Sequence, residues 1–353
     1  MTTPPAIPIE NIYYMFCYAW DRFEEAQSVP LGATPSPDLP NLLGRVLLHG
    51  TRALLRRGLD RNYQDYSDEI ATVRGRIDLG ASLNLQTRCI RRLVCEFDEL
   101  SHDLLHNQII KASLKRLARA QTIDPGLAHE MAMTAQRMPE VSDIWLERSA
   151  FARVQLHRNN AYYDFNLKIA ELAFDCLLPD PSTGGFAFHD ILRDETKMAR
   201  VFEEFVRNFY RSEQQEFKVL PLKINWDAEA LSTTGAARLP SMFVDAYLRS
   251  PTRRLIIDTK YYAKGLQQSL FGTPSFHSNN LYQIFSYLKN AAADEAFAGC
   301  EGMLLYPQVG QHLREIYSVQ GHPVTIATVN LAQSWPAISR DLMQLLMPVS
   351  NRH

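Results

Sequence analysis

The stretch from Ser241 to Tyr262 constrains the fold of this chain most, because it is typical of two apolar strands joined by a tight connection. The first strand carries one charged side chain, Asp245, and the second carries Asp258 and Lys260. The polar segment between the strands contains a proline and has the composition of a turn. The sequence therefore predicts an apolar β-hairpin with three charged side chains.

Simple pairing in this hairpin places Asp245 opposite Asp258, with the two Cβ atoms about 4.5–5.5 Å apart, where like charges are destabilising. Lys260 shares a face with Asp258 because side chains alternate along a strand. Buried charges are costly unless they are paired or bind metal, and a divalent cation between the aspartates would remove their repulsion. The pattern indicates metal-dependent phosphodiester hydrolysis. The alternative is an exposed hairpin in which Asp258 and Lys260 form a surface ion pair.

Two segments with helical periodicity add candidate residues. Met198 to Arg211 places Glu203 on an apolar, inward face and Arg207 on a face that we expect to be solvated. An inward glutamate needs a partner, which is either the metal site or another donor. Downstream, Gln283 and Tyr287 lie four residues apart on one helix face, where they either support the site or serve in ordinary packing.

A helix glutamate, an aspartate, D-x-K at a strand end and Q-x-x-x-Y, in that order, resemble the PD-(D/E)xK nuclease superfamily and its RecB-like branch. Val244 stands where many members have proline, and Asp258 where glutamate is commoner, but either carboxylate ligates metal. Nearly the whole chain resembles the McrC family, the nuclease subunits of McrBC 5-methylcytosine restriction systems. The segments that carry this likeness are IENIYYMFCYAWD (Ile9 to Asp21), VRGRIDL (Val73 to Leu79), CEFDELSHDLLHNQIIKASL (Cys95 to Leu114) and FEEFVRNFY.

The hairpin and the resemblance together imply a Mg²⁺-dependent DNA endonuclease, with Mn²⁺ as a substitute. The expected metal ligands are the carboxylates of Asp245 and Asp258 and the backbone carbonyl of Thr259. Lys260 would position or activate the attacking water, and Glu203 would be a fourth catalytic residue. Gln283 and Tyr287 would support the site.

The resemblance also implies partners. They are a McrB-like hexameric AAA+ GTPase whose hydrolysis this chain stimulates, double-stranded DNA, and a second nuclease copy for the other strand. The sequence contains no G-x-x-x-x-G-K-[ST] loop, so we expect no nucleotide to bind this chain. Two other functions stay open: a regulator or adaptor of the ring with little cleavage of its own, and a motor-independent RecB-like exonuclease.

With 353 residues the chain is long enough for two domains. We expect a mixed helical and small β domain at residues 1–180 that docks on the AAA+ ring. After a loop rich in proline and glycine, residues 186–353 would form an α+β or α/β nuclease domain, a restriction-endonuclease-like mixed sheet flanked by helices. A net charge of −2 argues against a free-standing, high-affinity DNA-binding protein, so we expect DNA contact to come from a local basic patch or a partner.

Other motifs yield weaker expectations. Arg74 and Arg76 flank a glycine at a turn that contacts phosphate, contacts an acidic partner surface, or is simply exposed. His102 and His106 lie four apart on a helix expected from Ser101 to Gln121, and we expect structural roles for them. Five scattered cysteines without a C-x-x-C pair indicate free thiols and no iron–sulfur cluster. No signal peptide or membrane span is visible, which favours a cytoplasmic protein.

We expect further secondary structure on either side of the hairpin. The additional expected elements are a helix over Asp143 to Phe151, a first sheet strand over Glu216 to Trp226, and two edge strands over Arg314 to Val319 and Val324 to Leu331.

Overall fold

The computed structural model describes residues 7–23, 38–86, 92–179, 186–188, 194–229, 231, 238–261, 276–309 and 312–348. The chain forms two compact units, one combining residues 1–34 with 190–353 and the other comprising residues 35–189. The first thirty-four residues therefore belong with the C-terminal unit, whereas the sequence placed them in a domain of residues 1–180. The physical reason is that helix α1 (Ile9–Ala19) packs against helix α9 (Glu195–Glu213). The expected boundary loop lies mostly outside the described residues.

Helices dominate the unit of residues 35–189. Its elements, apart from an extended arm, are α3 (Leu39–Arg57), α5 (Leu105–Ala118), α6 (Pro125–Gln136), α7 (Arg148–Ala152), the 3₁₀ helix η2 (Ala161–Tyr163), α8 (Asp164–Cys176) and the short pair β4 (Leu177–Pro179) and β5 (Phe186–Phe188). Helix α3 begins at Asp38, whose side chain accepts a hydrogen bond from the Asn41 amide at 3.0 Å. The helix expected from Ser101 begins only at Leu105, because Ser101 still pairs with Asn62 in a strand.

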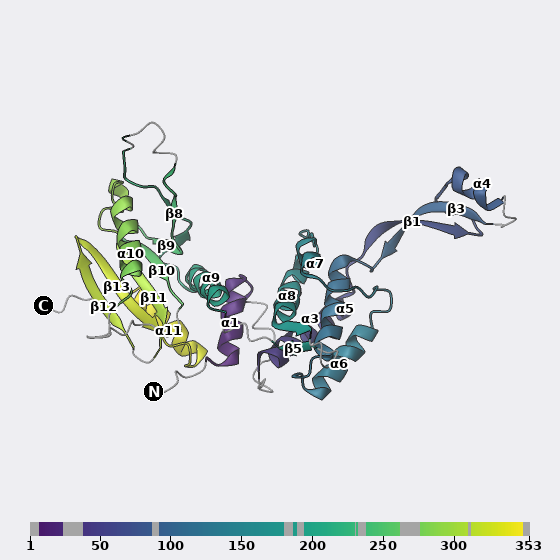
Figure 1. Cartoon of the computed structure of the whole chain (residues 1–353), viewed down its shortest axis with the longest axis horizontal. Coiled ribbons are helices and arrows are strands. Elements are labelled where there is room, and N and C mark those ends of the chain that lie inside the picture. Colours follow the sequence, from purple (N-terminus) through teal and green to yellow (C-terminus); the bar gives the residue numbers. More distant parts are fainter. Residues whose placement is uncertain are drawn as a thin grey trace. The chain divides into compact units, whose positions relative to one another are not determined.

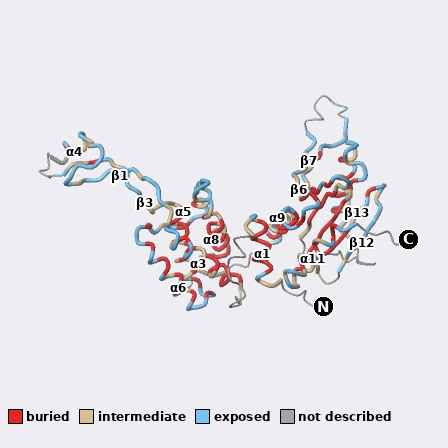
Figure 2. The backbone as a smooth tube through the Cα atoms, turned by 180° about the vertical axis from the view of Figure 1, so that it is seen from behind, coloured by how far each residue is buried: buried red, intermediate tan, exposed pale blue. Residues whose placement is uncertain are grey.

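Three antiparallel strands form the arm that extends from the helices of this unit (Figure 1). They are β1 (Asn62–Ile70), β3 (Leu93–Ser101) and the short β2 (Arg76–Ile77), with helix α4 (Leu79–Gln86) near the tip. Most arm residues are exposed (Figure 2), so the arm is held by backbone pairing more than by a core of its own.

A six-stranded sheet in the order β12-β13-β11-β10-β9-β6 forms the centre of the other unit. Its strands are β6 (Lys218–Leu220), β9 (Ala246–Arg249), β10 (Arg254–Thr259), β11 (Glu301–Pro307), β12 (Arg314–Val319) and β13 (His322–Val329). The pairs β10–β11 and β11–β13 are parallel and the remaining pairs are antiparallel, so the sheet is mixed, as expected. Helix α11 (Trp335–Leu345) packs against β13.

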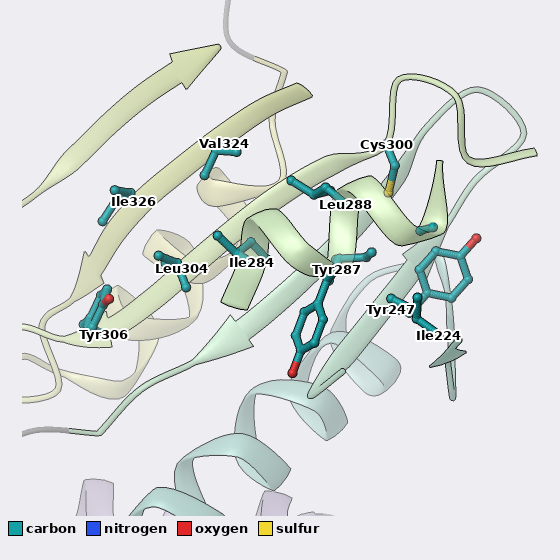
Figure 3. Packing of buried hydrophobic residues seen from close by; sticks show 12 residues of the cluster. Ile224, Tyr247, Ile284, Tyr287, Leu288, Cys300, Leu304, Tyr306, Val324 and Ile326 are labelled. Carbon is teal, nitrogen blue, oxygen red and sulfur yellow. The ribbon is translucent and has the colours of Figure 1, made fainter. Parts of the chain in front are cut away.

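Helix α10 (Ser278–Ala291) covers one face of this sheet. Its Ile284 and Leu288 pack on Leu304 of β11 (Figure 3), in a buried cluster that also contains Ile256 of β10. Gly302 lets the helix approach closely, because a Cβ at this position would lie 2.9 Å from the Cδ1 atom of Leu288. Close packing of this kind fixes the height of α10 above the sheet.

Three expected elements differ from the structure. The strand over Glu216 to Trp226 is split into β6 and a separate β7 (Lys223–Ile224), which pairs with β8 (Met242–Phe243). The strand β13 lies inside the sheet rather than at its edge, because it pairs with both β11 and β12. The helix over Asp143 to Phe151 is reduced to α7.

Candidate active site

The register of β9 and β10 brings the two aspartates together. Ile257 is paired with Ala246 at the end of the ladder, so the next residues outward, Asp258 and Asp245, face each other. This is the pairing that the hairpin argument predicts. The strand expected to run through Asp245 is interrupted at Val244 and Asp245, and this break separates β8 from β9.

Asp245 is anchored to the end of β10. Its Oδ2 atom accepts a hydrogen bond from the Thr259 amide at 2.7 Å and another from the Thr259 hydroxyl at 2.8 Å. Two donors on one oxygen fix the orientation of the carboxylate. The side chain therefore ties the start of β9 to the end of β10.

Asp258 is fully buried, and its Oδ2 atom lies 2.6 Å from the Nζ atom of Lys260. Its Oδ1 atom is also buried and has no hydrogen-bond donor among the described residues. The pKa of Asp258 is raised to about 7. Burial is the largest cause, the ammonium of Lys260 opposes it, and the charges of Asp245 and Glu203 add to it. A buried carboxyl group with an unsatisfied oxygen is costly without a cation.

Glu203 reaches the site from helix α9. It is half-buried, and burial followed by the charge of Asp245 raises its pKa. Its carboxylate also pairs with Arg207, at 3.2 Å from Oε1 to NH1. The same NH1 atom donates a hydrogen bond to the backbone carbonyl of Asp245 at 3.2 Å. Glu203 thus faces both the aspartates and another donor, the two alternatives that the sequence left open.

Sequence reasoning missed Arg207 as a residue of the site and placed it on a solvated face. The signal that could have found it is its spacing from Glu203, because residues four apart on a helix are neighbours. Its guanidinium links α9 to the backbone of Asp245.

Gln283 and Tyr287 form a hydrogen-bonded pair on α10. The Gln283 amide donates to the Tyr287 hydroxyl at 2.6 Å, and that hydroxyl donates to the Phe243 carbonyl at 3.1 Å. Burial raises the pKa of Tyr287, so it stays a neutral donor at ordinary pH. The pair supports the backbone two residues before Asp245.

The carboxylate oxygens of Asp245 and Asp258 fit a hard divalent cation, provided that water and substrate complete the coordination shell of the cation. Among the described residues, no three His, Cys, Asp or Glu side chains are grouped so that they could hold a metal ion by themselves. Mg²⁺ needs fewer protein ligands, because it is usually held by one or two carboxylates and completes its shell with water and substrate phosphate. The opposed Asp245 and Asp258, with the unsatisfied oxygen of Asp258, match that requirement.

Arg74 and Arg76 belong to the other unit, on its arm. The Arg74 guanidinium lies 4.5 Å from the centroid of the Phe97 ring and 3.5 Å from Glu99, while Arg76 is opposite Glu96. The paired strands β1 and β3 of the arm are acidic. Their carboxylates come from Asp65, Asp68, Glu69, Glu96, Asp98 and Glu99. This setting disfavours a phosphate contact at the arginines and leaves the exposed turn and the partner contact.

His106 has the structural role expected of it. Its Nε2 atom lies 3.1 Å from Asp60, and its ring packs edge-on against Tyr163 at a centroid distance of 4.5 Å. His102 lies beside it at the base of the arm, where its Nδ1 atom is 3.2 Å from the Asp60 carbonyl.

Comparison with known proteins gives three consistent results. The profile of the family described as McrBC 5-methylcytosine restriction system component matches residues 10–307. The Type IV methyl-directed restriction enzyme EcoKMcrBC of Escherichia coli (strain K12) is 31% identical over 341 residues, which cover 97% of each protein. A chain in the refined half-complex from a tetradecameric assembly of Thermococcus gammatolerans McrB AAA+ hexamers with bound McrC has a similar fold. The TM-score is 0.60 at 16% identity, over 96% of this chain and 76% of that one.

No helix among the described residues is both long and apolar enough to cross a membrane.

Proposed function

This chain belongs to the family of McrBC 5-methylcytosine restriction system components, and from this premise we propose that it is the system's Mg²⁺-dependent DNA endonuclease subunit. The observation that carries the proposal is the buried Asp258, which faces Asp245 across the hairpin and contacts Lys260 at 2.6 Å. A surface ion pair does not account for a fully buried carboxylate with an unsatisfied oxygen. We infer that these residues form a PD-(D/E)xK nuclease site.

Asp245 and Asp258 would hold the cation, with the Thr259 carbonyl as a further ligand. Mg²⁺ supplies charge stabilisation at the scissile phosphate and lowers the pKa of an attacking water. The Lys260 ammonium, beside Asp258, positions that water and compensates negative charge as it develops. Glu203 accepts a proton or a hydrogen bond from the water network, while Arg207 holds its carboxylate in place.

The partner follows from the relatives. The E. coli protein is a methyl-directed restriction enzyme, and the T. gammatolerans structure contains McrB AAA+ hexamers with bound McrC. We propose that a McrB-like AAA+ GTPase likewise licenses this chain, that the chain stimulates GTP hydrolysis, and that two copies cut double-stranded DNA. Residues 35–189 would carry the docking surface, and residues 1–34 with 190–353 the nuclease.

Cleavage of circular plasmid tests the chemistry. Methylated and unmethylated plasmid would be incubated in Mg²⁺ with the pure chain, or with the chain, its AAA+ partner and nucleotide. We expect cutting of the methylated plasmid in the complete mixture, and its loss with Asp258→Ala or Lys260→Ala. Matched controls are Asp227→Ala and Lys289→Ala, which remove exposed charges from the same unit.

The outcomes separate the candidate functions. Cutting that survives Asp258→Ala would show that the active site lies elsewhere. If the chain stimulates GTP hydrolysis but neither wild type nor variant cuts, the adaptor function is favoured. Degradation of linear but not circular DNA by the pure chain would instead indicate an exonuclease.

A further inference from the structure

The two-stranded ribbon β7–β8 lies next to the candidate active site and has two unlike faces. Lys223 is paired with Phe243, and Ile224 with Met242. Ile224 is buried in the core cluster beneath α10, and Met242 packs against that cluster. Because side chains alternate along a strand, Lys223 and Phe243 point together to the outer face.

Phe243 is an exposed aromatic ring on a well-held backbone. Its side chain is 66% exposed, and its carbonyl accepts the hydrogen bond from Tyr287. The ribbon is extended beyond its two ladder pairs by a bond from the Trp226 indole to the Pro240 carbonyl, at 2.8 Å. A single exposed apolar side chain is ordinary on a protein surface. What distinguishes Phe243 is its position beside the candidate active site.

That position is two residues before Asp245, so the ribbon leads directly into the candidate site. Two residues of chain span at most about 7 Å, which is about two nucleotides of rise along one DNA strand at 3.4 Å each. With a phosphate bound at Asp245 and Asp258, a nucleotide within about two of it would lie in reach of the Phe243 ring. Lys223, directly opposite, is exposed and forms no ion pair with a described carboxylate.

We propose that Lys223 and Phe243 form a DNA contact of the nuclease unit, a claim that rests on the proposed endonuclease function. The Phe243 ring packs on a base or sugar beside the scissile phosphate, because aromatic faces stack on any base. The Lys223 ammonium binds a backbone phosphate. At the end of the ladder nearest Asp245 the exposed charge is the cation of Lys223, which suits DNA better than a second copy of this chain. The exposed Asp227, Glu229 and Arg238 all lie beyond the other end of the ribbon, where Trp226 meets Pro240.

The two residues should affect binding in different ways. Fluorescence anisotropy of a labelled 30-base-pair duplex would be measured with the full chain in Ca²⁺, over a series of NaCl concentrations. Loss of one stacked ring weakens binding by roughly 10-fold, so we expect this for Phe243→Ala with no change in salt dependence. Loss of one phosphate contact makes the slope of log K against log salt shallower by about 0.9, which we expect for Lys223→Gln.

Cleavage in the complete mixture gives a second readout. Both variants should raise the DNA concentration needed for half-maximal cutting and leave cutting at saturating DNA close to wild type. The controls are Tyr317→Ala, which removes a 44% exposed ring from β12, and Arg340→Gln, which removes an exposed cation from α11. Thermal melts would verify that all four variants fold.

Unchanged affinity and salt slope in both variants would overturn the contact, while loss of cutting in Asp258→Ala would leave the endonuclease standing. Loss of a dimer in sedimentation with Phe243→Ala, at wild-type DNA affinity, would assign the ribbon to contacts between copies. If wild type neither binds nor cuts DNA in any mixture, both proposals fail together.

Discussion

At the scale of single residues, the burial of Asp258 dominates the electrostatics of the site. Without a bound cation, the charged form of this carboxylate destabilises the fold. Its pKa is raised from 3.8 to about 7, so the folded chain holds a proton that the unfolded chain releases. The contribution of Asp258 to the free energy of unfolding is therefore fully present at low pH. It is lost as the pH rises from about 4 to about 7 and does not fall further above that. The full difference, about three pKa units, corresponds to about 4 kcal/mol.

Asp258→Asn removes this cost and should stabilise the protein at neutral and higher pH. In the presence of a chelator at pH 8, we expect the free energy of unfolding of the variant to exceed that of wild type by up to about 4 kcal/mol. This difference should shrink toward pH 4. Urea unfolding across this pH range measures it. Added Mg²⁺ should stabilise wild type and leave the variant unchanged, since a ligand stabilises only the fold that binds it. A variant that is less stable than wild type at pH 8 would contradict this account of Asp258.

Arg207 lends itself to a second prediction at this scale. It holds both Glu203 and the Asp245 carbonyl, and residues that orient metal ligands typically contribute 10–100-fold to activity or metal affinity. Arg207→Gln should therefore slow cutting by about 10-fold or more, with partial recovery in Arg207→Lys.

The pH profile separates positioning by Arg207 from a merely structural effect. Arg207 lowers the pKa of Glu203, so Arg207→Gln should move any limb of the profile that reports Glu203 to higher pH. Arg211→Gln, an exposed arginine one turn along the helix, is the control. Equal slowing by both substitutions, with an unmoved profile, would assign Arg207 to helix stability alone.

The contrast between Asp258 and Arg207 shows which residues of the site could be predicted from sequence. The opposition of Asp245 and Asp258 follows from counting outward from a turn, and pairing across a hairpin has a period of two residues. The partner of Glu203 could not be found this way. Arg207 lies near the border between the inward and outward faces of α9, where helical periodicity does not decide which way a long side chain turns.

At the scale of elements, the sequence predicts what each segment forms better than what it pairs with. The antiparallel pairing of β9 with β10 around the turn and the helix α10 are present as predicted, because the patterns that indicate them are local. The interior place of β13 was missed, since strand order depends on the parallel crossover from β11. The division between β6 and β7 was missed because the apolar run continues through a segment that changes partner, from β9 to β8.

The close seat of α10 on the sheet is also an element-scale property. Gly302 admits Ile284 and Leu288 at a separation that a Cβ would prevent, and the same helix carries Gln283 and Tyr287 to the backbone of Phe243. Glycine within a strand is a signal of close approach, but the sequence does not say which element approaches. The packing of α10 on the sheet thus helps to fix the position of β8, the strand that leads into the site.

At the scale of the whole molecule, the unit that carries the candidate site is discontinuous in sequence. The Asn208 amide of α9 donates to the carbonyls of Tyr18 and Ala19, at 2.8 and 3.2 Å, and so caps the end of α1. Tyr18 donates to Glu213 at 2.5 Å, and its ring packs on Phe209. Helix α1 is therefore part of the core on which α9, and with it Glu203, is placed.

This discontinuity predicts how fragments of the chain behave. Residues 190–353 alone would expose the apolar face of α9 that α1 covers, and we expect them to aggregate or to melt without cooperativity. Residues 35–189 have a core of their own and should melt cooperatively as an isolated fragment. Joining residues 1–34 to 190–353 through a flexible linker restores the buried face and should restore a cooperative melt. Calorimetry of the three proteins decides the matter. A cooperative melt of residues 190–353 without α1, at the melting temperature of the joined protein, would contradict this prediction. It would show that this segment folds without residues 1–34.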